Sequence, residues 1–191
     1  MNSSNNFKKG SQDSFDNNWK NRSETKNNYW TRNSPKNQIE LAFRMHWNLF
    51  NELIPKNSGK KVLEIGCGRG SISSYFADNN YDCTLLDISE SVINVAQDIF
   101  NRTGHSANFV VGDALNLPFE NDSFDVLVSI GLFEHFENLE KLISEHNRVL
   151  KKDGIVLAYV VPEMRNNVQS KFDFINTILK FINSIFSNTS K

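Results

Sequence analysis

A short run that ends in three glycines constrains the fold of this chain more than any other feature. Apolar residues dominate positions 62–65, and Gly66, Gly68 and Gly70 follow at every second position. This pattern is typical of a buried parallel strand that breaks into a tight turn. A helical pattern over 71–77 begins directly after it. Glycines there permit positive φ and close approach of a ligand to the backbone, while the helix N-terminus offers N–H groups.

The spacing of these glycines differs from that of a dinucleotide-binding turn. A dinucleotide-binding turn has G-x-G-x-x-G before its helix. Here the third glycine, Gly70, comes one residue earlier, and Ser71 holds the sixth position. Glu64 stands two residues before the first glycine, and the next predicted strand, 82–86, is followed by Asp87. A carboxylate roughly 20 residues beyond such a turn can accept hydrogen bonds from both ribose hydroxyls.

Composition and charge narrow the class of protein. The 191 residues suffice for one domain with a tail or cap, and the net charge of −1 gives no strong nucleic-acid signal. Cys67 and Cys83 are too few for a disulfide framework, which favours a cytoplasmic protein. The chain begins with no signal peptide, and no apolar run reaches the roughly 20 residues of a transmembrane segment.

Two segments precede the glycine turn. Residues 1–33 are rich in Asn, Ser and Lys and lack periodicity, so we predict a disordered tail. Its aromatic stretch 29–32 lies where it could fold over a bound cofactor as part of a lid. Ser34 and Pro35 predict the start of a helix, which apolar residues at helical spacing continue to Pro55. We therefore expect a cap helix within 34–57 and the main domain over 58–191.

Beyond residue 58, strand and helix patterns alternate, as in a parallel sheet covered on both faces. The predicted strands are 62–65, 82–86, 107–111, 124–130 and 155–161; the predicted helices are 71–77, one capped by Ser89, and 138–150. The fold class is therefore α/β, a doubly wound, mostly parallel, Rossmann-like sheet that ends after its fifth strand. Asp153 and Gly154 are expected to stop the last of these helices.

Five segments in order resemble the Rossmann-like (class I) S-adenosylmethionine-dependent methyltransferases. They are VLEIGCGRG, LLDIS, GDALNLPF, NDSFDVLVS and RVLKKDG, within residues 61–162. Their pattern is similar to the small-molecule branch that includes the ubiquinone and menaquinone biosynthesis enzymes. The resemblance implies S-adenosylmethionine as cofactor and in-line methyl transfer to a carbon, oxygen or sulfur atom of a small-molecule acceptor.

The resemblance also implies that the cofactor lies across the ends of the predicted strands. The residues implicated in binding it are Glu64, Gly66, Cys67, Gly68, Gly70, Asp87, Ile88, Asp113, Ala114 and Ile130. Asp87 would bind the ribose hydroxyls, Ile88 would pack on the adenine, and Asp113 would accept from the adenine amino group beside Ala114. Glu64 would either hold the turn and orient the cofactor near its amino-acid end, or only cap its own loop.

The stretch 129–135 follows the fourth predicted strand and should face the transferred methyl group, because ligands of open parallel sheets lie beyond the carboxyl ends of the strands. It lacks the Asn/Asp-Pro-Pro-aromatic run of the family's nucleobase amino-methyltransferases, and its apolar residues suit a small acceptor. His135 is the candidate general base and Glu134 could orient it, although a pocket-lining role without proton transfer stays open. No cluster has metal-ligand spacing, so we expect no metal.

The end of the sequence departs from the family pattern. The family sheet normally finishes with two more strands in an antiparallel hairpin, so the chain is either an N-terminal fragment or a five-stranded variant. An open fifth strand needs cover. The apolar helix predicted over 168–186 would cover it, or would mediate self-association or partner contact. A catalytically inactive, methyltransferase-like binding or scaffold subunit is the alternative to an enzyme.

Overall fold

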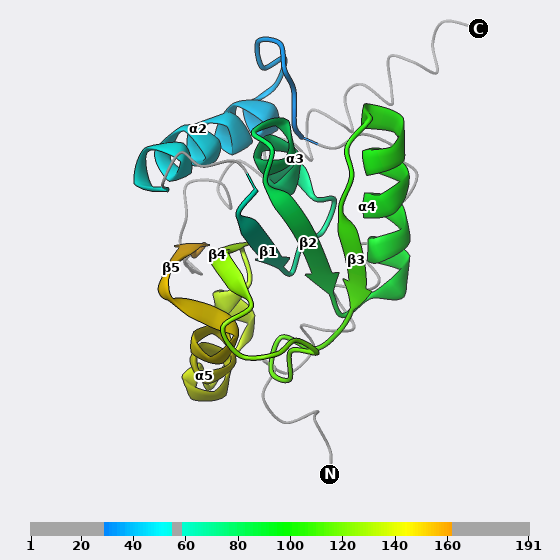
Figure 1. Ribbon diagram of the computed structural model, residues 1–191. Helices are drawn as coiled ribbons and strands as arrows, with labels where there is room; N and C mark the ends of the chain where they lie inside the picture. The colour runs from blue at the N-terminus through cyan, green and yellow to red at the C-terminus, as the bar shows by residue number, and fades with distance from the viewer. Residues whose placement is uncertain (1–28, 55–58, 162–191) are drawn as a thin grey trace, which may run out of the picture. The chain divides into compact units, whose positions relative to one another are not determined.

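The computed structural model describes residues 29–54 and 59–161, in which a central sheet lies between helices (Figure 1). Its strands are β1 Lys61–Ile65, β2 Asp82–Asp87, β3 Asn108–Val111, β4 Phe124–Ile130 and β5 Leu150–Tyr159. Their order is β3-β2-β1-β4-β5, and every neighbouring pair is parallel. The α/β, doubly wound sheet predicted from the alternation of strands and helices is confirmed.

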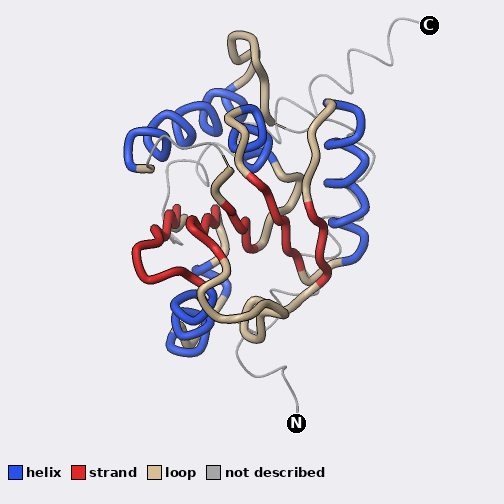
Figure 2. The backbone as a smooth tube through the Cα atoms, in the orientation of Figure 1, coloured by secondary structure: helices blue, strands red, loops and turns tan. Residues whose placement is uncertain are grey.

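Helices cover both faces of this sheet, as the backbone trace shows (Figure 2). They are α2 Gln38–Leu53, α3 Ser71–Asp78, α4 Glu90–Thr103 and α5 Glu140–Val149, with a short 3-10 turn, η2, at Phe133–His135. Alternate strand residues face opposite ways, so the chain has two cores. Val62 and Cys83 belong to the core under α2, α3 and α4, whereas Leu63 and Leu127 pack with Leu142 of α5. None of these described helices has the length and apolarity to cross a bilayer.

The helix α2 begins three residues later than the predicted start at Pro35. The Asn37 side-chain oxygen accepts from Ile39 N at 3.1 Å and Glu40 N at 2.9 Å, and the Glu40 carboxylate accepts from Lys36 N at 2.8 Å. These bonds satisfy N–H groups at the helix start in the manner of a capping box. Ser34 and Pro35 also fit the sequence pattern of a helix start, but the helix begins after Asn37, which forms the reciprocal pair with Glu40.

The end of α5 also differs from its prediction, because no loop separates it from β5. The helix ends at Val149 and the strand begins at Leu150, which pairs with Phe124. The register then shifts, and Val126 pairs with Ile155. Residues 151–154, expected to stop the helix, therefore form an irregularity inside β5. The helix predicted over 168–186, with its expected contacts, lies outside the described residues.

Gly70 is the turn position where a side chain would fit least well. Its φ is +65°, and an added Cβ would lie 2.6 Å from Leu85 Cδ2 and 2.7 Å from Phe100 Cε2. We expect Gly70→Ala to lower the free energy of unfolding by roughly 2–5 kcal/mol, the sum of left-handed strain and overpacking. Urea denaturation measures this loss.

Gly104 is the matched control for that substitution. Its φ is +76°, but an added Cβ would have no atom within 4 Å. Gly104→Ala should therefore cost only the backbone strain, roughly 1–2 kcal/mol. Equal losses in the two variants would show that the packing of Gly70 against Leu85 and Phe100 does not matter.

Candidate active site

The glycine turn begins while it is still bonded to the neighbouring strand. Gly66 N and Cys67 N both donate to Leu86 O of β2, at 2.9 and 3.0 Å. Gly66, Gly68 and Gly70 have φ values of +70°, +52° and +65°, in the left-handed region that glycine adopts without strain. Gly70 is the N-cap of α3. The structure thus joins the predicted glycines into one turn at the N-terminus of a helix.

Asp87 ties this turn to the loop that follows β2. Its Oδ2 accepts from Gly68 N at 3.1 Å, and its Oδ1 accepts from Ser89 N at 3.1 Å. The main-chain oxygen of Asp87 accepts from Gly112 N at 2.9 Å, so the end of β3 meets the same residue. Ile88, which follows Asp87, has an exposed side chain. The predicted ribose-binding carboxylate therefore lies directly beside the glycine turn.

Glu64 contacts the first turn of α3. Its Oε2 accepts from Ser73 N at 3.1 Å and from the Ser73 hydroxyl. Burial raises the pKa of Glu64 to about 8; the bonds from Ser73 oppose this rise and the nearby charge of Asp87 adds to it. The carboxylate thus caps α3 and holds the turn by doing so. Ser73 was not identified from the sequence, because only the fold shows which helical N–H group the carboxylate reaches.

The side chains of three other residues predicted to bind the cofactor are buried in a core or stabilise a turn. The Cys67 side chain is buried in the core under α2, α3 and α4 and donates to Gly68 O of the turn at 3.7 Å, and the Ala114 side chain is buried in the core that contains Leu142. Asp113 stabilises its own turn, because its Oδ1 accepts from Leu115 N at 2.8 Å and its main-chain oxygen accepts from Asn116 N at 2.9 Å. Asp113 still follows the end of β3, on the edge of the sheet that carries Asp87.

The loop after β4 lies against the first glycine of the turn. A Cβ added to Gly66 would be 3.0 Å from Leu132 Cδ1. Ile130 is half-buried at the end of β4, and His135 is half-buried at the end of η2. Glu134 Oε1 accepts from Val161 N at 3.3 Å, a bond that ties the loop to the residues after β5. Leu132 of this loop therefore lies against the glycine turn, while the predicted position of the loop beside the transferred methyl group stays a prediction.

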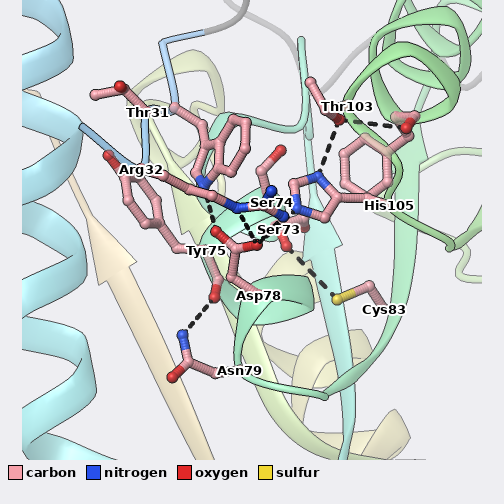
Figure 3. A network of polar contacts seen from close by, with 12 residues as sticks. Thr31, Arg32, Ser73, Ser74, Tyr75, Asp78, Asn79, Cys83, Thr103 and His105 are labelled. Carbon is pink, nitrogen blue, oxygen red and sulfur yellow. Dashed lines mark hydrogen bonds and ion pairs between the residues drawn. The ribbon is translucent and has the colours of Figure 1, made fainter.

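The aromatic stretch before α2 is held on α3 by a group of polar contacts around Asp78. Trp30 Nε1 donates to Asp78 Oδ2 at 2.9 Å, while Arg32 Nη2 and His105 Nε2 lie 2.7 and 3.0 Å from Asp78 Oδ1 (Figure 3). Residues 29–33, which the sequence assigned to the tail, thus make defined contacts. These partners lie far apart in the sequence, so no local sequence pattern could predict their contacts.

The same stretch reaches the glycine turn at the opposite end of α3. Tyr29 N donates to Ser71 Oγ at 3.1 Å, and Ser71 is the first residue of the helix. The guanidinium carbon of Arg69, within the turn, lies 5.6 Å from the centre of the Tyr29 ring. Tyr29 therefore lies beside the glycine turn, and a lid role for this stretch stays a prediction.

The part of the chain that contains the turn, Asp87 and the loop after β4 matches a known family. The family model described as "Methyltransferase domain" matches residues 63–158, from β1 to the end of β5. The chain belongs to this methyltransferase family. The cofactor of the family is S-adenosylmethionine, as the sequence predicted.

Individual relatives share this domain over part of their length. The phthiotriol/phenolphthiotriol dimycocerosates methyltransferase of Mycobacterium leprae is 35% identical over 142 residues, which cover 72% of this chain and 52% of that protein. The norajmaline N-methyltransferase of Rauvolfia serpentina is 31% identical over 137 residues, 69% of this chain and 46% of that one. The crystal structure of YcgJ from Bacillus subtilis is 29% identical with a TM-score of 0.57, over 60% of this chain and 50% of that one. The chain spans about half the length of the curated relatives it matches.

The raised pKa of Glu64 gives this methyltransferase domain a pH-dependent stability. A carboxyl whose pKa rises from 4.5 to about 8 on folding stabilises the fold fully at low pH, and this contribution is lost as the pH rises through 8. The wild type should lose about 1 kcal/mol of unfolding free energy between pH 7 and 8. Glu64→Gln, which cannot ionise, should abolish this loss in urea denaturation.

The exposed Glu120 supplies the control for this measurement. Glu120→Gln removes a carboxylate without changing the capped helix, so the pH dependence of the wild type should persist. A Glu64→Gln variant that loses as much stability as the wild type between pH 7 and 8 would contradict the inferred protonation of Glu64.

Proposed function

We propose that this chain transfers the methyl group of S-adenosylmethionine to a carbon, oxygen or sulfur atom of a small molecule. The observation that best supports the proposal is the convergence of three elements at one edge of the sheet. Asp87 holds Gly68 of the turn at 3.1 Å, and Leu132 of the loop after β4 lies against Gly66. A cofactor bound to the turn would therefore adjoin the loop expected to face the acceptor.

The residues at this edge fit the chemical groups of S-adenosylmethionine. Gly66, Gly68 and Gly70 would let the backbone of the turn approach the methionine and ribose portions, in positive-φ conformations that glycine adopts without strain. Asp87 would accept from the ribose hydroxyls, since a carboxylate accepts up to about four hydrogen bonds and can contact a ligand while it holds the turn. The exposed Ile88 offers an apolar surface to the adenine, and Asp113 an acceptor for its amino group.

The cofactor, when bound, supplies a methyl group on a positively charged sulfur with a neutral leaving group. The protein's share of the rate then comes largely from holding the acceptor in line with the bond that breaks. Ile130 and Leu132 would form an apolar wall beside the acceptor. His135 would take a proton from an acceptor atom that must lose one.

The buried thiols bear on where this reaction would occur. Cys67 and Cys83 are both free and buried. Free thiols are the rule in a reducing compartment, which supports our proposal that the chain works in the cytoplasm.

Two measurements test the proposed reaction. Titration calorimetry of the full chain should detect binding of S-adenosylmethionine and of S-adenosylhomocysteine, and much weaker binding of NADH. Release of S-adenosylhomocysteine should then be followed with a panel of phenols, thiols and activated carbon acids. Cofactor binding without turnover on any acceptor would support an inactive binding subunit, and the absence of cofactor binding would overturn the proposal.

Asp87 provides a direct test of the cofactor site. We expect Asp87→Ala to weaken S-adenosylmethionine binding by roughly 2–3 kcal/mol, because hydrogen bonds to a charged acceptor are lost and Gly68 N loses its partner. Calorimetry measures the affinity, and circular dichroism verifies the fold. Asp82→Ala, at the exposed start of the same strand, should leave the affinity unchanged. Equal affinity of Asp87→Ala and wild type would remove Asp87 from the site.

A further inference from the structure

A row of four rings runs from the glycine turn to the end of β5. Tyr29 stacks on Phe43 of α2, with ring centres 5.6 Å apart. Phe43 meets His46, one turn further along α2, edge to face at 6.0 Å, and His46 lies 4.1 Å from the Tyr159 ring. We call Tyr29, Phe43, His46 and Tyr159 the ring row.

Both ends of the ring row lie at parts of the candidate active site. Tyr29 is bonded to Ser71 at the start of α3 and lies beside Arg69 of the turn. At the other end, Tyr159 is in register with Ile130, and its main-chain oxygen accepts from Gly131 N at 2.9 Å. The ring row therefore links the turn after β1 to the residues that follow β4, the two places between which a methyl group would be transferred.

The side chain of Tyr159 is on the same face of the sheet as α2. Alternate residues of β5 share a face, and Leu157 and Ile155 belong to or pack on the core beneath α2. Tyr159 itself is 43% exposed, and the other three rings are half-buried. The ring row thus lies at the margin of the core, with aromatic surface still available for contact.

His46 adds a polar group to this aromatic surface. Its Nδ1 is buried and has no hydrogen-bond partner in the described structure. Such an atom destabilises the fold unless a ligand or water satisfies it. Burial also lowers the pKa of His46, so the ring is neutral at pH 7 and can accept as well as donate a hydrogen bond.

We infer that the ring row is the acceptor-binding surface and that it selects a flat aromatic acceptor with a hydroxyl or amino group for His46. This inference rests on the proposed function and adds the substrate class. Stacked or edge-to-face aromatic rings attract one another beyond the effect of their buried area, and a saturated ring of equal size lacks this attraction. The polar group of the acceptor satisfies Nδ1 of His46.

Binding of simple probes to the full chain, saturated with S-adenosylhomocysteine, tests the inference. 2-Naphthol should bind, naphthalene should bind more weakly, and the saturated analogue 2-decalol should bind about threefold to tenfold more weakly than 2-naphthol. His46→Phe keeps a ring but lacks the nitrogens. It should weaken 2-naphthol about fivefold to tenfold and leave naphthalene unchanged. Tyr159→Leu should weaken both aromatic probes.

Two controls separate this inference from the proposed function. Met45, the neighbour of His46 on α2, is 62% exposed, and Met45→Ala should bind every probe as the wild type does. S-adenosylmethionine affinity should be the same in the wild type and in His46→Phe. A wild type that binds the cofactor but binds no naphthol, or binds 2-decalol equally well, overturns the inference while the proposed function stands. A wild type that does not bind the cofactor fails the proposed function instead.

Discussion

The hydrogen bond from Gly68 N to Asp87 is the contact on which the candidate site depends. The strand register explains this contact: β1 and β2 run parallel with Ile65 opposite Leu86, so the residue after β1 lies level with Asp87, the last residue of β2. The turn after β1 therefore meets the carboxylate at the end of β2, and Leu86 O accepts from two further N–H groups of the turn. A shift of one residue in this pairing would carry Asp87 to the other face of the sheet.

The sequence predicted the parts of the fold that depend on local patterns. The predicted strand 124–130 matches β4 residue for residue. Local signals failed where two of them compete, as at α2, whose start at Gln38 is selected by the Asn37–Glu40 pair. They also failed at Asp78, because its partners Trp30 and His105 come together only through packing.

In the candidate site too, the sequence motif predicts which residues lie near the turn, whereas packing determines the directions of their side chains. The motif identifies which residues flank the turn, and Gly66, Gly68 and Asp87 lie where it places them. It does not state where a side chain points. Cys67 lies within the motif, yet its thiol is buried in the core, and Glu64 is directed to the Ser73 amide. That amide needs a partner at the start of α3, so capping explains the acidic residue before any ligand is considered.

The helix α3 connects the two halves of the proposed active site. Its N-terminus is fixed by Glu64 and the glycine turn, and its far end carries Asp78, which holds the stretch leading into α2. Its middle packs on α2, where Trp47 stacks on Tyr75 at 5.7 Å and meets Phe76 edge to face at 5.1 Å. Trp47 follows His46 directly, so the burial of Trp47 sets the direction in which the His46 ring leaves the helix. The packing that stabilises the core thus also positions the ring row, whose Tyr29 end lies beside the turn.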